Sequence, residues 1–312
     1  MFNFKRERLV QPPIGEGAHG EVFSYQKTPQ DSRWVVKRPI GKKIEDLFAC
    51  LPEIVLGFSC DHPCVVPVKG YSIQPTNDNK YEIYIKLPRM SGGTLADELR
   101  KRKLKNSYYT DDEIVKNFYA LVSGVDYLHN RKIFHGDIKI NNILLDEKGN
   151  IKLSDIGSAK FVPDEDFYHP MSKTAGAQNY KAPEIIKYER DLQEYNLFHK
   201  DDNNNLPMAN TLTKEHHYLA DSWSLGLTML EMCMLVPRLI NPYDSVQLIE
   251  ERLQKLRKEA EKRYQGVILE IIFGLLQTDP AQRLKVSAIK AKLEESFKQI
   301  LVGRFYINSS LR

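Results

Sequence analysis

The chain has 312 residues, of which 42% are hydrophobic and 28% are charged, so it is long and apolar enough for one two-lobed domain or for two domains. Its 45 basic and 41 acidic residues leave a formal net charge of +4, an excess too small to indicate a nucleic-acid-binding protein. The four cysteines are few and unevenly spaced, so no disulfide framework is implied and a reducing compartment is favoured.

The sequence contains no segment typical of export or of a membrane span. The first eight residues lack the apolar core of a signal peptide. The most apolar run, from Leu225 to Val236, is too short for a span and contains Glu231. We therefore expect a protein without stable membrane insertion that works in the cytoplasm, or in a host cytoplasm if it is a secreted effector.

The first predicted element is a glycine-rich hairpin. Gly15, Gly17 and Gly20 are followed by Val22 and then by a polar turn. In a dinucleotide-binding fold the same glycine spacing leads from a strand into a helix, whereas here a strand leads through the glycines into another strand. Such a hairpin can lay its main-chain N–H groups over phosphates.

Lys37 ends the next strand, from where its long side chain can reach beneath the hairpin. Apolar periodicity predicts a helix from Lys43 to Ser59, and Pro52 is expected to kink or restart it. Glu53 follows this proline and is expected near a helix start. An ion pair between Lys37 and Glu53 would fix the ammonium for phosphate contact, and Glu45 is the rival partner.

Cys60, His62 and Cys64 lie within five residues of chain, a spacing that also occurs in zinc sites. No second pair of ligands follows at a useful spacing, so buried structural thiols are the favoured interpretation. Two further strands are predicted at 65–71 and 81–87, which makes five strands and one helix, a small α+β lobe.

Beyond these strands, the chain is predicted to be helical apart from one polar stretch. Thr94 is expected to cap a helix that ends at Lys103, and Asp111 or Asp112 to cap a helix that ends at Asn130. The run from 219 to 236 is apolar on nearly all sides and predicts a core helix. Amphipathic helices are expected at 246–261, 267–276 and 286–301. The predicted layout is a small, mostly β lobe and a larger, mostly α lobe, and ligands bind in clefts between such lobes.

The polar stretch, residues 135–142, combines groups that suit phosphoryl transfer. Asp137 can accept a proton from a hydroxyl, Lys139 can stabilise negative charge on a phosphoryl group, and Asn142 can ligate a hard divalent cation. Two short apolar strands joined by a Gly/Asn turn follow, and they would hold Asp155 near the same cleft as Asp137. In phosphoryl transfer, positioning and charge neutralisation supply most of the rate, which is what these residues can provide.

The ordered set of motifs resembles the eukaryotic-type protein kinase family from about Leu9 to Leu301. The eight motifs that carry the resemblance are Gly15-x-Gly17-x-x-Gly20-x-Val22, Val35-Val36-Lys37, Glu53 nine residues before His62-Pro63, His135-Gly136-Asp137 to Asn142, Asp155-Ile156-Gly157, Ala182-Pro183-Glu184, Asp221-x-Trp223-Ser224-x-Gly226 and Asp279-Pro280-x-x-Arg283. The resemblance implies an α+β, two-lobed fold in a single kinase domain, with a small lobe at about 9–88, a linker at 89–93 and a large lobe at 94–301. It also implies a buried ion pair between Glu184 and Arg283.

The resemblance further implies ATP and Mg²⁺ as cofactors. Lys37, braced by Glu53, would hold the α- and β-phosphates, while Asp155 and Asn142 would bind magnesium. Asp137 would orient and deprotonate the acceptor hydroxyl. Lys139 would steady the transferred phosphoryl group, and its place two residues after the catalytic aspartate favours a serine or threonine of a protein as the acceptor.

The remaining nucleotide-binding positions follow from the same resemblance. They are Ile14, Gly15, Gly17, Gly20, Val22, Val35, Leu87, Pro88, Met90 and Leu144. Leu87 would be the gatekeeper. Adenine would bond to the carbonyl of Pro88 and to the amide of Met90, which is compatible with proline because it lacks only the donor.

One departure from the family pattern concerns regulation. Gly136 replaces the arginine that, in many relatives, pairs with a phosphorylated activation loop. Phosphate on Ser172 or Thr174 would then have one fewer cation to order it, so we expect activity that does not require this phosphorylation.

Three other departures concern packing and substrate contact. Ile156 replaces a phenylalanine and keeps an apolar plug. Gly57 lies where the family has a bulky apolar residue, which leaves the hydrophobic stack between the lobes thin or the helix alignment shifted. Ala177 lies where serine/threonine kinases usually have a threonine near the substrate.

Two segments have alternative interpretations. The insert at about 187–217 is longer than the family needs, and it is either a solvated surface loop with Asp201–Asn205 at its centre or a dock for a partner or substrate. Arg100 to Lys105 is a solvated helix end, with an acidic partner or a membrane surface as the alternatives.

Two other functions remain open beside that of an active protein kinase. One is a pseudokinase or scaffold that works as a binding module, against which the presence of Lys37, Asp137, Asn142 and Asp155 argues. The other is phosphoryl transfer to a small molecule, against which the Ala182-Pro183-Glu184 segment argues.

Overall fold

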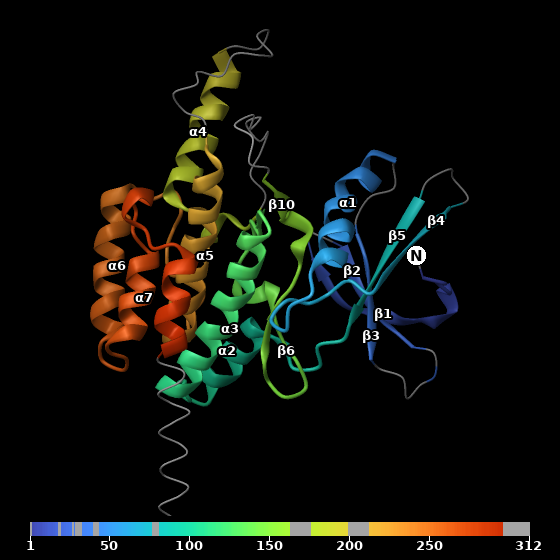
Figure 1. Cartoon of the computed structure of the whole chain (residues 1–312), viewed down its shortest axis with the longest axis horizontal. Helices are drawn as coiled ribbons and strands as arrows, with labels where there is room; N and C mark the ends of the chain where they lie inside the picture. The colour runs from blue at the N-terminus through green and yellow to red at the C-terminus, as the bar shows by residue number, and fades with distance from the viewer. Residues whose placement is uncertain are drawn as a thin grey trace, which may run out of the picture.

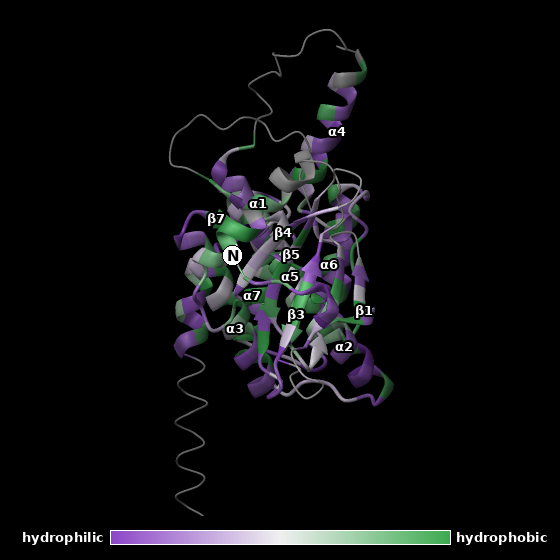
Figure 2. Ribbon diagram, turned by 90° about the vertical axis from the view of Figure 1, so that its right-hand side faces the viewer, coloured by the Kyte–Doolittle hydropathy of each residue, from purple (hydrophilic) through white to green (hydrophobic). Residues whose placement is uncertain are grey.

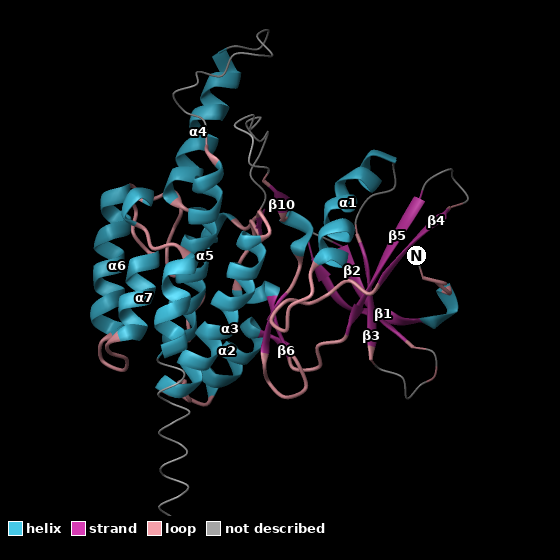
Figure 3. Ribbon diagram, viewed as in Figure 1, coloured by secondary structure: helices cyan, strands magenta, loops and turns pink. Residues whose placement is uncertain are grey.

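The structure is a computed structural model that describes residues 2–17, 20–26, 28, 33–39, 44–76, 81–162, 176–198 and 212–295. A five-stranded sheet and one helix form a small lobe, and helices form most of a larger lobe (Figures 1 and 3). The predicted α+β, two-lobed fold is therefore confirmed.

The sheet of the small lobe has the strand order β1-β2-β3-β5-β4, and each neighbouring pair is antiparallel. Its strands are β1 (Leu9–Gly17), β2 (Gly20–Tyr25), β3 (Trp34–Arg38), β4 (Gly70–Pro75) and β5 (Tyr81–Pro88). Because side chains alternate between the faces of a strand, Ile83 and Ile85 pack toward the helix while Tyr84 packs on the other face. Lys37 lies opposite Ile85 in register, so its side chain shares the helix-covered face.

The other face of the sheet is covered by the first residues of the chain. The rings of Phe2 and Phe4 lie against Tyr25, and Phe4 stacks on Tyr84 with 3.9 Å between ring centroids. The main-chain N–H of Phe2 donates to the carbonyl of Tyr71 at 3.0 Å. This aromatic packing removes apolar surface from water on the side of the sheet that has no helix.

The helix of the small lobe, α1 (Ile44–Ser59), is assigned without a break through Pro52, so the expectation of a restart at this proline is wrong. Glu53 accordingly lies in the second half of α1 and not near its start. A proline inside a helix removes one main-chain hydrogen bond. Here Ile54 and Leu56 are buried directly after it, and such tertiary packing holds a helix together against a local preference.

Gly57 of α1 is in close contact with its neighbours. A Cβ at Gly57 would lie 2.2 Å from Cγ2 of Val68 and 3.3 Å from Cδ1 of Ile156. The missing side chain is therefore compensated by closer approach of the helix backbone, and the contact between the lobes is filled by Val68 and Ile156.

The large lobe is built from helices around a core of apolar side chains. Its α-helices are α2 (Leu95–Leu104), α3 (Asp111–Asn130), α4 (Pro183–Phe198), α5 (Lys214–Met234), α6 (Val246–Ala260) and α7 (Val267–Leu275), and residues 286–295 are also helical. Its short strands are β6 (Gly93–Thr94), β7 (Ile133–Phe134), β8 (Ile143–Leu145), β9 (Ile151–Leu153) and β10 (Lys160–Phe161). Short 3-10 helices lie at η1 (Arg6–Arg8), η2 (Ile140–Asn142), η3 (Ile156–Ser158), η4 (Gln178–Tyr180) and η6 (Pro280–Gln282).

The predicted cap of α3 is corrected by one residue. Thr110, not Asp111 or Asp112, is the N-cap, and its hydroxyl accepts from the main-chain N–H of Glu113. The carboxylate of Glu113 accepts in return from the N–H of Thr110 at 2.8 Å. This reciprocal pair satisfies two donors at once, whereas a capping aspartate alone would satisfy fewer. The predicted cap of α2, Thr94, is confirmed.

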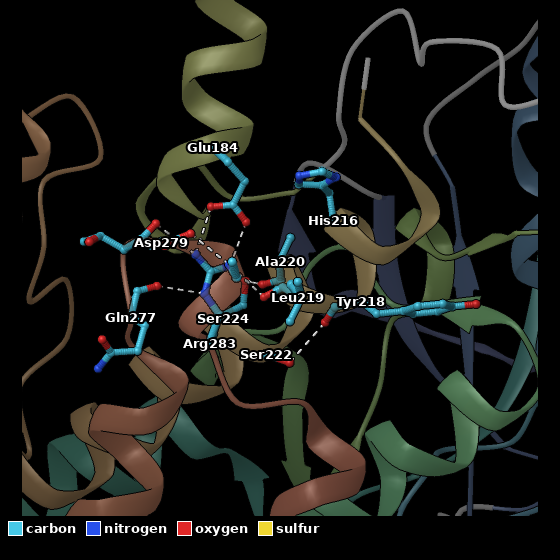
Figure 4. A network of polar contacts seen from close by, with 12 residues as sticks. Glu184, His216, Tyr218, Leu219, Ala220, Ser222, Ser224, Gln277, Asp279 and Arg283 are labelled. Carbon is cyan, nitrogen blue, oxygen red and sulfur yellow. Dashed lines mark hydrogen bonds and ion pairs between the residues drawn. The ribbon is translucent and has the colours of Figure 1, made fainter. Parts of the chain in front are cut away.

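Glu184 and Arg283 form the predicted ion pair, which anchors α4 (Figure 4). Nη1 and Nη2 of Arg283 donate to the two carboxylate oxygens of Glu184 at 2.6 and 2.9 Å. The same guanidinium donates to the carbonyls of Leu219 and Gln277, both at 2.9 Å. Its side chain has no exposed surface. Each of its nitrogens thus has an acceptor, which is the condition under which a buried charge is tolerated.

α4 includes the first part of the predicted insert. In Figures 1 and 2 its second half projects beyond the other helices, and it remains helical as far as Phe198. The segment at 187–198 is therefore not a loop, as one interpretation had it, and Tyr188 within it is buried. Asp201–Asn205 lie outside the described residues. In the described part of the chain, no helix is long and apolar enough to span a bilayer.

Each lobe contains one of the two tryptophans of the chain. Trp34 lies in β3 and is half-buried, with Nζ of Lys86 4.1 Å from its ring centroid. Trp223 lies in α5, is 1% exposed and has Cζ of Arg283 5.2 Å from its ring centroid. The two indoles thus lie in unlike surroundings.

Candidate active site

The predicted glycine hairpin is formed by β1 and β2. Gly15 pairs with Val22 and Gly17 with Gly20, and the two residues of the turn lie outside the described part. Gly20 has a φ of +124°, and a Cβ there would lie 2.3 Å from the carbonyl oxygen of Arg38. Only glycine fits this position, because the hairpin passes so close to the end of β3.

Lys37 connects the two lobes. Its Nζ donates to the carboxylate of Glu53 at 2.8 and 3.0 Å and to Oδ1 of Asp155 at 2.7 Å. Burial alone would lower the pKa of Lys37, but the two carboxylates outweigh it and raise this pKa above its ordinary value. The predicted pairing with Glu53 is present, so the alignment of α1 is not shifted. The side chain of the rival partner, Glu45, lies outside the described part of the structure.

Asp137 is held by donors on both carboxylate oxygens. Lys139 Nζ and Asn142 Nδ2 donate to Oδ2 at 2.6 and 2.7 Å, and the main-chain N–H of Ala177 donates to Oδ1 at 2.8 Å. The side chain of Asp137 has no exposed surface. Its main-chain N–H donates to Nδ1 of His135, whose Nε2 then donates to the carbonyl of Ser154 at 3.1 Å. Together these hydrogen bonds fix the position and orientation of the Asp137 carboxylate.

The main chain directly before Asp137 is hydrogen-bonded to the side chain of Asp221 in α5. The N–H groups of His135 and Gly136 donate to the carboxylate of Asp221 at 2.7 and 2.9 Å, and Nε2 of His129 lies 2.9 Å from it. Burial would raise the pKa of Asp221, but these partners outweigh it and lower that pKa. Gly136 has a φ of +75°, a left-handed conformation that costs other residues energy.

Asn142 and Asp155 are brought close by the hydrogen bonds between η2, β8 and β9. The N–H and the hydroxyl of Ser154 both donate to the carbonyl of Asn142, at 2.8 and 2.9 Å. Asn142 uses its amide nitrogen to bond twice to Asp137, which leaves its amide oxygen for another partner. An amide oxygen and a carboxylate are ligands that fit Mg²⁺, which also takes oxygens from phosphates. The residues present therefore fit a magnesium–nucleotide complex.

The cleft between the lobes has a volume of about 520 Å³. One end is lined by predicted residues, namely Gly15, Gly20, Val22, Lys37, Lys139, Asn142 and Asp155. Glu53 and Asp137 lie behind this wall, bonded to Lys37 and Lys139. The positions predicted for adenine are close by in the fold without lining this cavity. Val35 pairs with Leu87 across β3 and β5, Ile14 is exposed, and Pro88, Met90 and Leu144 are half-buried.

The other end of the cleft is lined by residues that the sequence did not single out for this role. They are Ala177, Asn179, Tyr180, Pro237 and Arg238. The sequence marked Ala177 only as a departure from the family pattern. Tyr180 and Arg238 have no local signal in the sequence. They lie more than 40 residues after Asp137 in the chain, and only the tertiary structure brings them to the cleft.

The alternative of a zinc site at Cys60, His62 and Cys64 finds no support. His62 uses Nδ1 to accept from the N–H of Cys64 at 3.2 Å, and its Nε2 lies 3.3 Å from the hydroxyl of Ser123. In the described ranges, no group of three histidine, cysteine or acidic side chains is arranged to hold a metal ion. The cysteines in question are partly or fully buried free thiols.

Comparison with known proteins gives consistent relatives. Residues 9–199 match the family model described as protein kinase domain. CBL-interacting serine/threonine-protein kinase 8 of Arabidopsis thaliana is 31% identical over 185 residues, which cover 56% of this chain and 38% of that protein. Serine/threonine-protein kinase hippo of Drosophila melanogaster is 27% identical over 311 residues, which cover 95% and 40%. Serine/threonine-protein kinase AtPK1/AtPK6 of Arabidopsis thaliana is 28% identical over 284 residues, which cover 88% and 51%.

The chain thus spans between about two fifths and one half of the length of these relatives. The family match covers more than half of the chain and includes the glycine hairpin, Lys37, Asp137 and Asp155. This chain belongs to the protein kinase domain family.

Proposed function

We propose that the protein transfers the γ-phosphoryl group of Mg-ATP to a serine or threonine hydroxyl of a protein. The observation that carries this proposal is the position of Lys37, whose ammonium bonds to Glu53 of one lobe and Asp155 of the other at the wall of the cleft. A buried ammonium held by two carboxylates is already oriented for contact with phosphate oxygens. Such positioning supplies much of the rate in phosphoryl transfer.

Asp155 and Asn142 would hold the magnesium ion, and bound Mg²⁺ would neutralise charge that develops on the phosphates. Asn142 is well suited because its amide nitrogen is already bonded to Asp137, which fixes the direction of its amide oxygen. Gly15 and Gly20 place the main chain of the hairpin at the same end of the cleft.

Asp137 would accept the proton of the acceptor hydroxyl, and Lys139 would stabilise the transferred group. In this structure the N–H of Ala177 occupies Oδ1 of Asp137. An acceptor hydroxyl would donate in the same way, so it would share Oδ1 with this N–H or replace it when the protein substrate binds. The hydroxyl then points at the cleft in which Lys139, Asn142 and Asp155 lie.

A serine or threonine acceptor is supported by Lys139, two residues after Asp137, and by the relatives, whose names describe them as serine/threonine kinases. Independence of activation-loop phosphorylation is also part of the proposal. It is supported by the contact of Lys37 with both Glu53 and Asp155 and by glycine at position 136. Ser172 and Thr174 lie outside the described residues.

A binding module without catalysis is the second candidate, and one observation favours it. The carboxylate of Asp137 is fully buried, with donors on both oxygens, as it would be in a protein that never uses it as a base. The two functions differ in one measurable respect, which is the transfer of phosphate.

The test is incubation of the wild-type protein with Mg²⁺, γ-labelled ATP and a generic basic protein. The matched variant is Asp137→Asn, which keeps the volume of the side chain and removes its basicity. We expect label in the basic protein with the wild type and a loss of about a thousandfold or more with the variant. Equal incorporation would reject the role of Asp137. No incorporation by the wild type, together with nucleotide binding, would establish the binding module.

A further inference from the structure

The end of the cleft away from the glycine hairpin has a charge that the proposed nucleotide site does not use. This end is lined by Ala177, Asn179 and Tyr180 on one side and by Pro237 and Arg238 on the other. Arg238 is the charged residue among these five. Since Ala177 contacts the carboxylate of Asp137, this is the end from which an acceptor residue reaches that carboxylate.

The main chain of Arg238 is fixed by a buried carboxylate. Its N–H donates to Oε1 of Glu231 at 2.6 Å, and its φ is +56°. This left-handed conformation is unfavourable for a residue other than glycine, so the surrounding contacts have to hold it there. The place of Arg238 at the cleft is therefore built into the fold, because α5 supplies the group that holds it.

Glu231 attracts the guanidinium of Arg238 electrostatically, but its carboxylate oxygens bond to other groups. Its other oxygen, Oε2, accepts from the hydroxyl of Tyr180 at 2.6 Å, and the residue is 1% exposed. Because Glu231 is buried and does not line the cleft, its carboxylate is not exposed there, whereas the side chain of Arg238 is. What this end presents to a substrate is positive.

The other cations of the cleft are neutralised in place. Lys37 is bonded to Glu53 and Asp155, and Lys139 to Asp137. The side chain of Arg238, by contrast, is exposed, and it has no hydrogen bond or ion pair with any residue of the described ranges. A guanidinium without a partner at a binding surface attracts a carboxylate or a phosphate, with which it can form two parallel hydrogen bonds.

We propose that Arg238 selects protein substrates that carry an anionic side chain, a carboxylate or a phosphate, beside the acceptor serine or threonine. This inference rests on the proposed function, because it assigns a substrate class to the same cleft. Arg238 is a specificity-determining residue that contacts the substrate and takes no part in the chemistry. An anionic substrate residue gains a charge-assisted contact there, while a cationic one is repelled.

The test uses a set of synthetic peptides with one acceptor serine. At each of the positions that flank the serine, one peptide has Glu, one has Gln, one has Lys and one has phosphoserine. The enzymes are the wild type, Arg238→Gln, Arg238→Glu and a control, Lys255→Glu, which removes an exposed cation of α6 outside the cleft. All four proteins keep the main-chain N–H of residue 238, so the bond to Glu231 is retained.

For the wild type we expect kcat/KM to be about tenfold higher for the Glu peptide than for the Gln peptide at one or more positions. Arg238→Gln is expected to remove this ratio, and Arg238→Glu to reverse it in favour of the Lys peptide. Lys255→Glu is expected to keep the wild-type ratio. The phosphoserine peptide distinguishes the two anions, since a preference for it over Glu at the same position would mark phosphate as the ligand.

Three outcomes would overturn the inference or separate it from the proposed function. If the wild type phosphorylates all peptides equally, the inference fails and the kinase activity stands. If a preference for Glu survives in Arg238→Gln, another residue is responsible and the inference also fails. If the wild type phosphorylates no peptide, the proposed function fails. Fluorescence anisotropy with labelled Glu and Gln peptides, wild type against Arg238→Gln, then decides between anion binding and no preference.

Discussion

The main-chain N–H of Ala177 donates a 2.8 Å hydrogen bond to Oδ1 of Asp137, 40 residues earlier in the chain. This contact is possible because Gly176 lies against the main chain of Gly136. A Cβ at Gly176, where φ is +105°, would lie 2.3 Å from the carbonyl oxygen of Gly136. A side chain at this position would therefore push the segment away from Asp137.

The first prediction concerns this contact. Gly176→Ala is expected to lower the free energy of unfolding by about 2–3 kcal/mol, because backbone strain and a clash add up. The matched control is Gly149→Ala, at a φ of +75° with nothing within 4 Å of the added Cβ, where strain alone costs about 1 kcal/mol. Urea unfolding measures both, and hydrogen exchange at the amide of Ala177 should become faster only in Gly176→Ala. Equal losses in the two variants would contradict the clash.

The second prediction concerns the close approach of α1 to Val68. Gly57→Ala is expected to destabilise the protein by about 1–3 kcal/mol through overpacking, although alanine is favoured over glycine in a helix by about 0.5–1 kcal/mol. Phosphate transfer should fall as well, because Glu53 lies one turn away on the same helix. Val68→Ala removes Cγ2, the atom with which the new Cβ collides. The double variant Gly57→Ala, Val68→Ala should therefore lose less stability than the sum of the losses of the two single variants. A more stable Gly57→Ala protein would disprove the contact.

The third prediction concerns the ion pair of Figure 4. Arg283→Lys is expected to lower the free energy of unfolding by about 2–4 kcal/mol, since a lysine cannot serve Glu184 and the carbonyls of Leu219 and Gln277 together. Arg100→Lys is the control, because its bond to Asp97 is exposed and such pairs contribute about 0–1 kcal/mol. Thermal and urea unfolding of both variants provide the comparison, and similar losses would show that burial of the pair is not what matters.

The fourth prediction concerns pH. Burial raises the pKa of Glu231 to about 7 from an ordinary value of 4.5. The folded chain therefore binds this proton more tightly than the unfolded chain, so stability falls as the pH rises from about 4.5 to 7. The loss amounts to about 3 kcal/mol. The free energy of unfolding is measured at pH 5 and at pH 8 for the wild type and for Glu231→Gln. It should fall more between these two pH values in the wild type than in the variant. Parallel curves would exclude this role of Glu231.

The fifth prediction concerns the activation loop. The double variant Ser172→Ala and Thr174→Ala is expected to keep a kcat/KM within about threefold of the wild type, because glycine at position 136 offers no cation to a phosphate there. Steady-state kinetics with the generic basic protein measures this, after phosphatase treatment of both proteins. A strong loss in the double variant, or a strong gain on phosphorylation of the wild type, would count against it.

Much of this architecture follows from local pattern. The hairpin of β1 and β2, the strand of Lys37 and the turn between β8 and β9 each have their own signal in the sequence, so they were predictable. Thr110 was also within reach, because Glu113 three residues later completes a capping box. The continuity of α1 through Pro52 was not, since burial of Ile54 outweighs the local effect of this proline.

The contacts that decide the chemistry of the site are mostly long-range, and local pattern does not show them. The N–H of Ala177 on Asp137 depends on a contact between residues 40 apart in the chain. The filling of the space at Gly57 by Val68 depends on how closely a helix approaches a strand. Arg238 reaches the cleft because a buried carboxylate on α5 holds its main chain. Each of these requires the tertiary structure.

The placement of the two tryptophans gives each lobe its own optical reporter. Trp34, half-buried beside the ammonium of Lys86, and Trp223, enclosed in the helical core, are the two indoles of the chain. Their fluorescence will respond differently to unfolding, since Trp34 is partly exposed to solvent in the native state and Trp223 is buried. Unfolding of the sheet of the small lobe and of the helical core of the large lobe can thus be followed side by side without any attached dye.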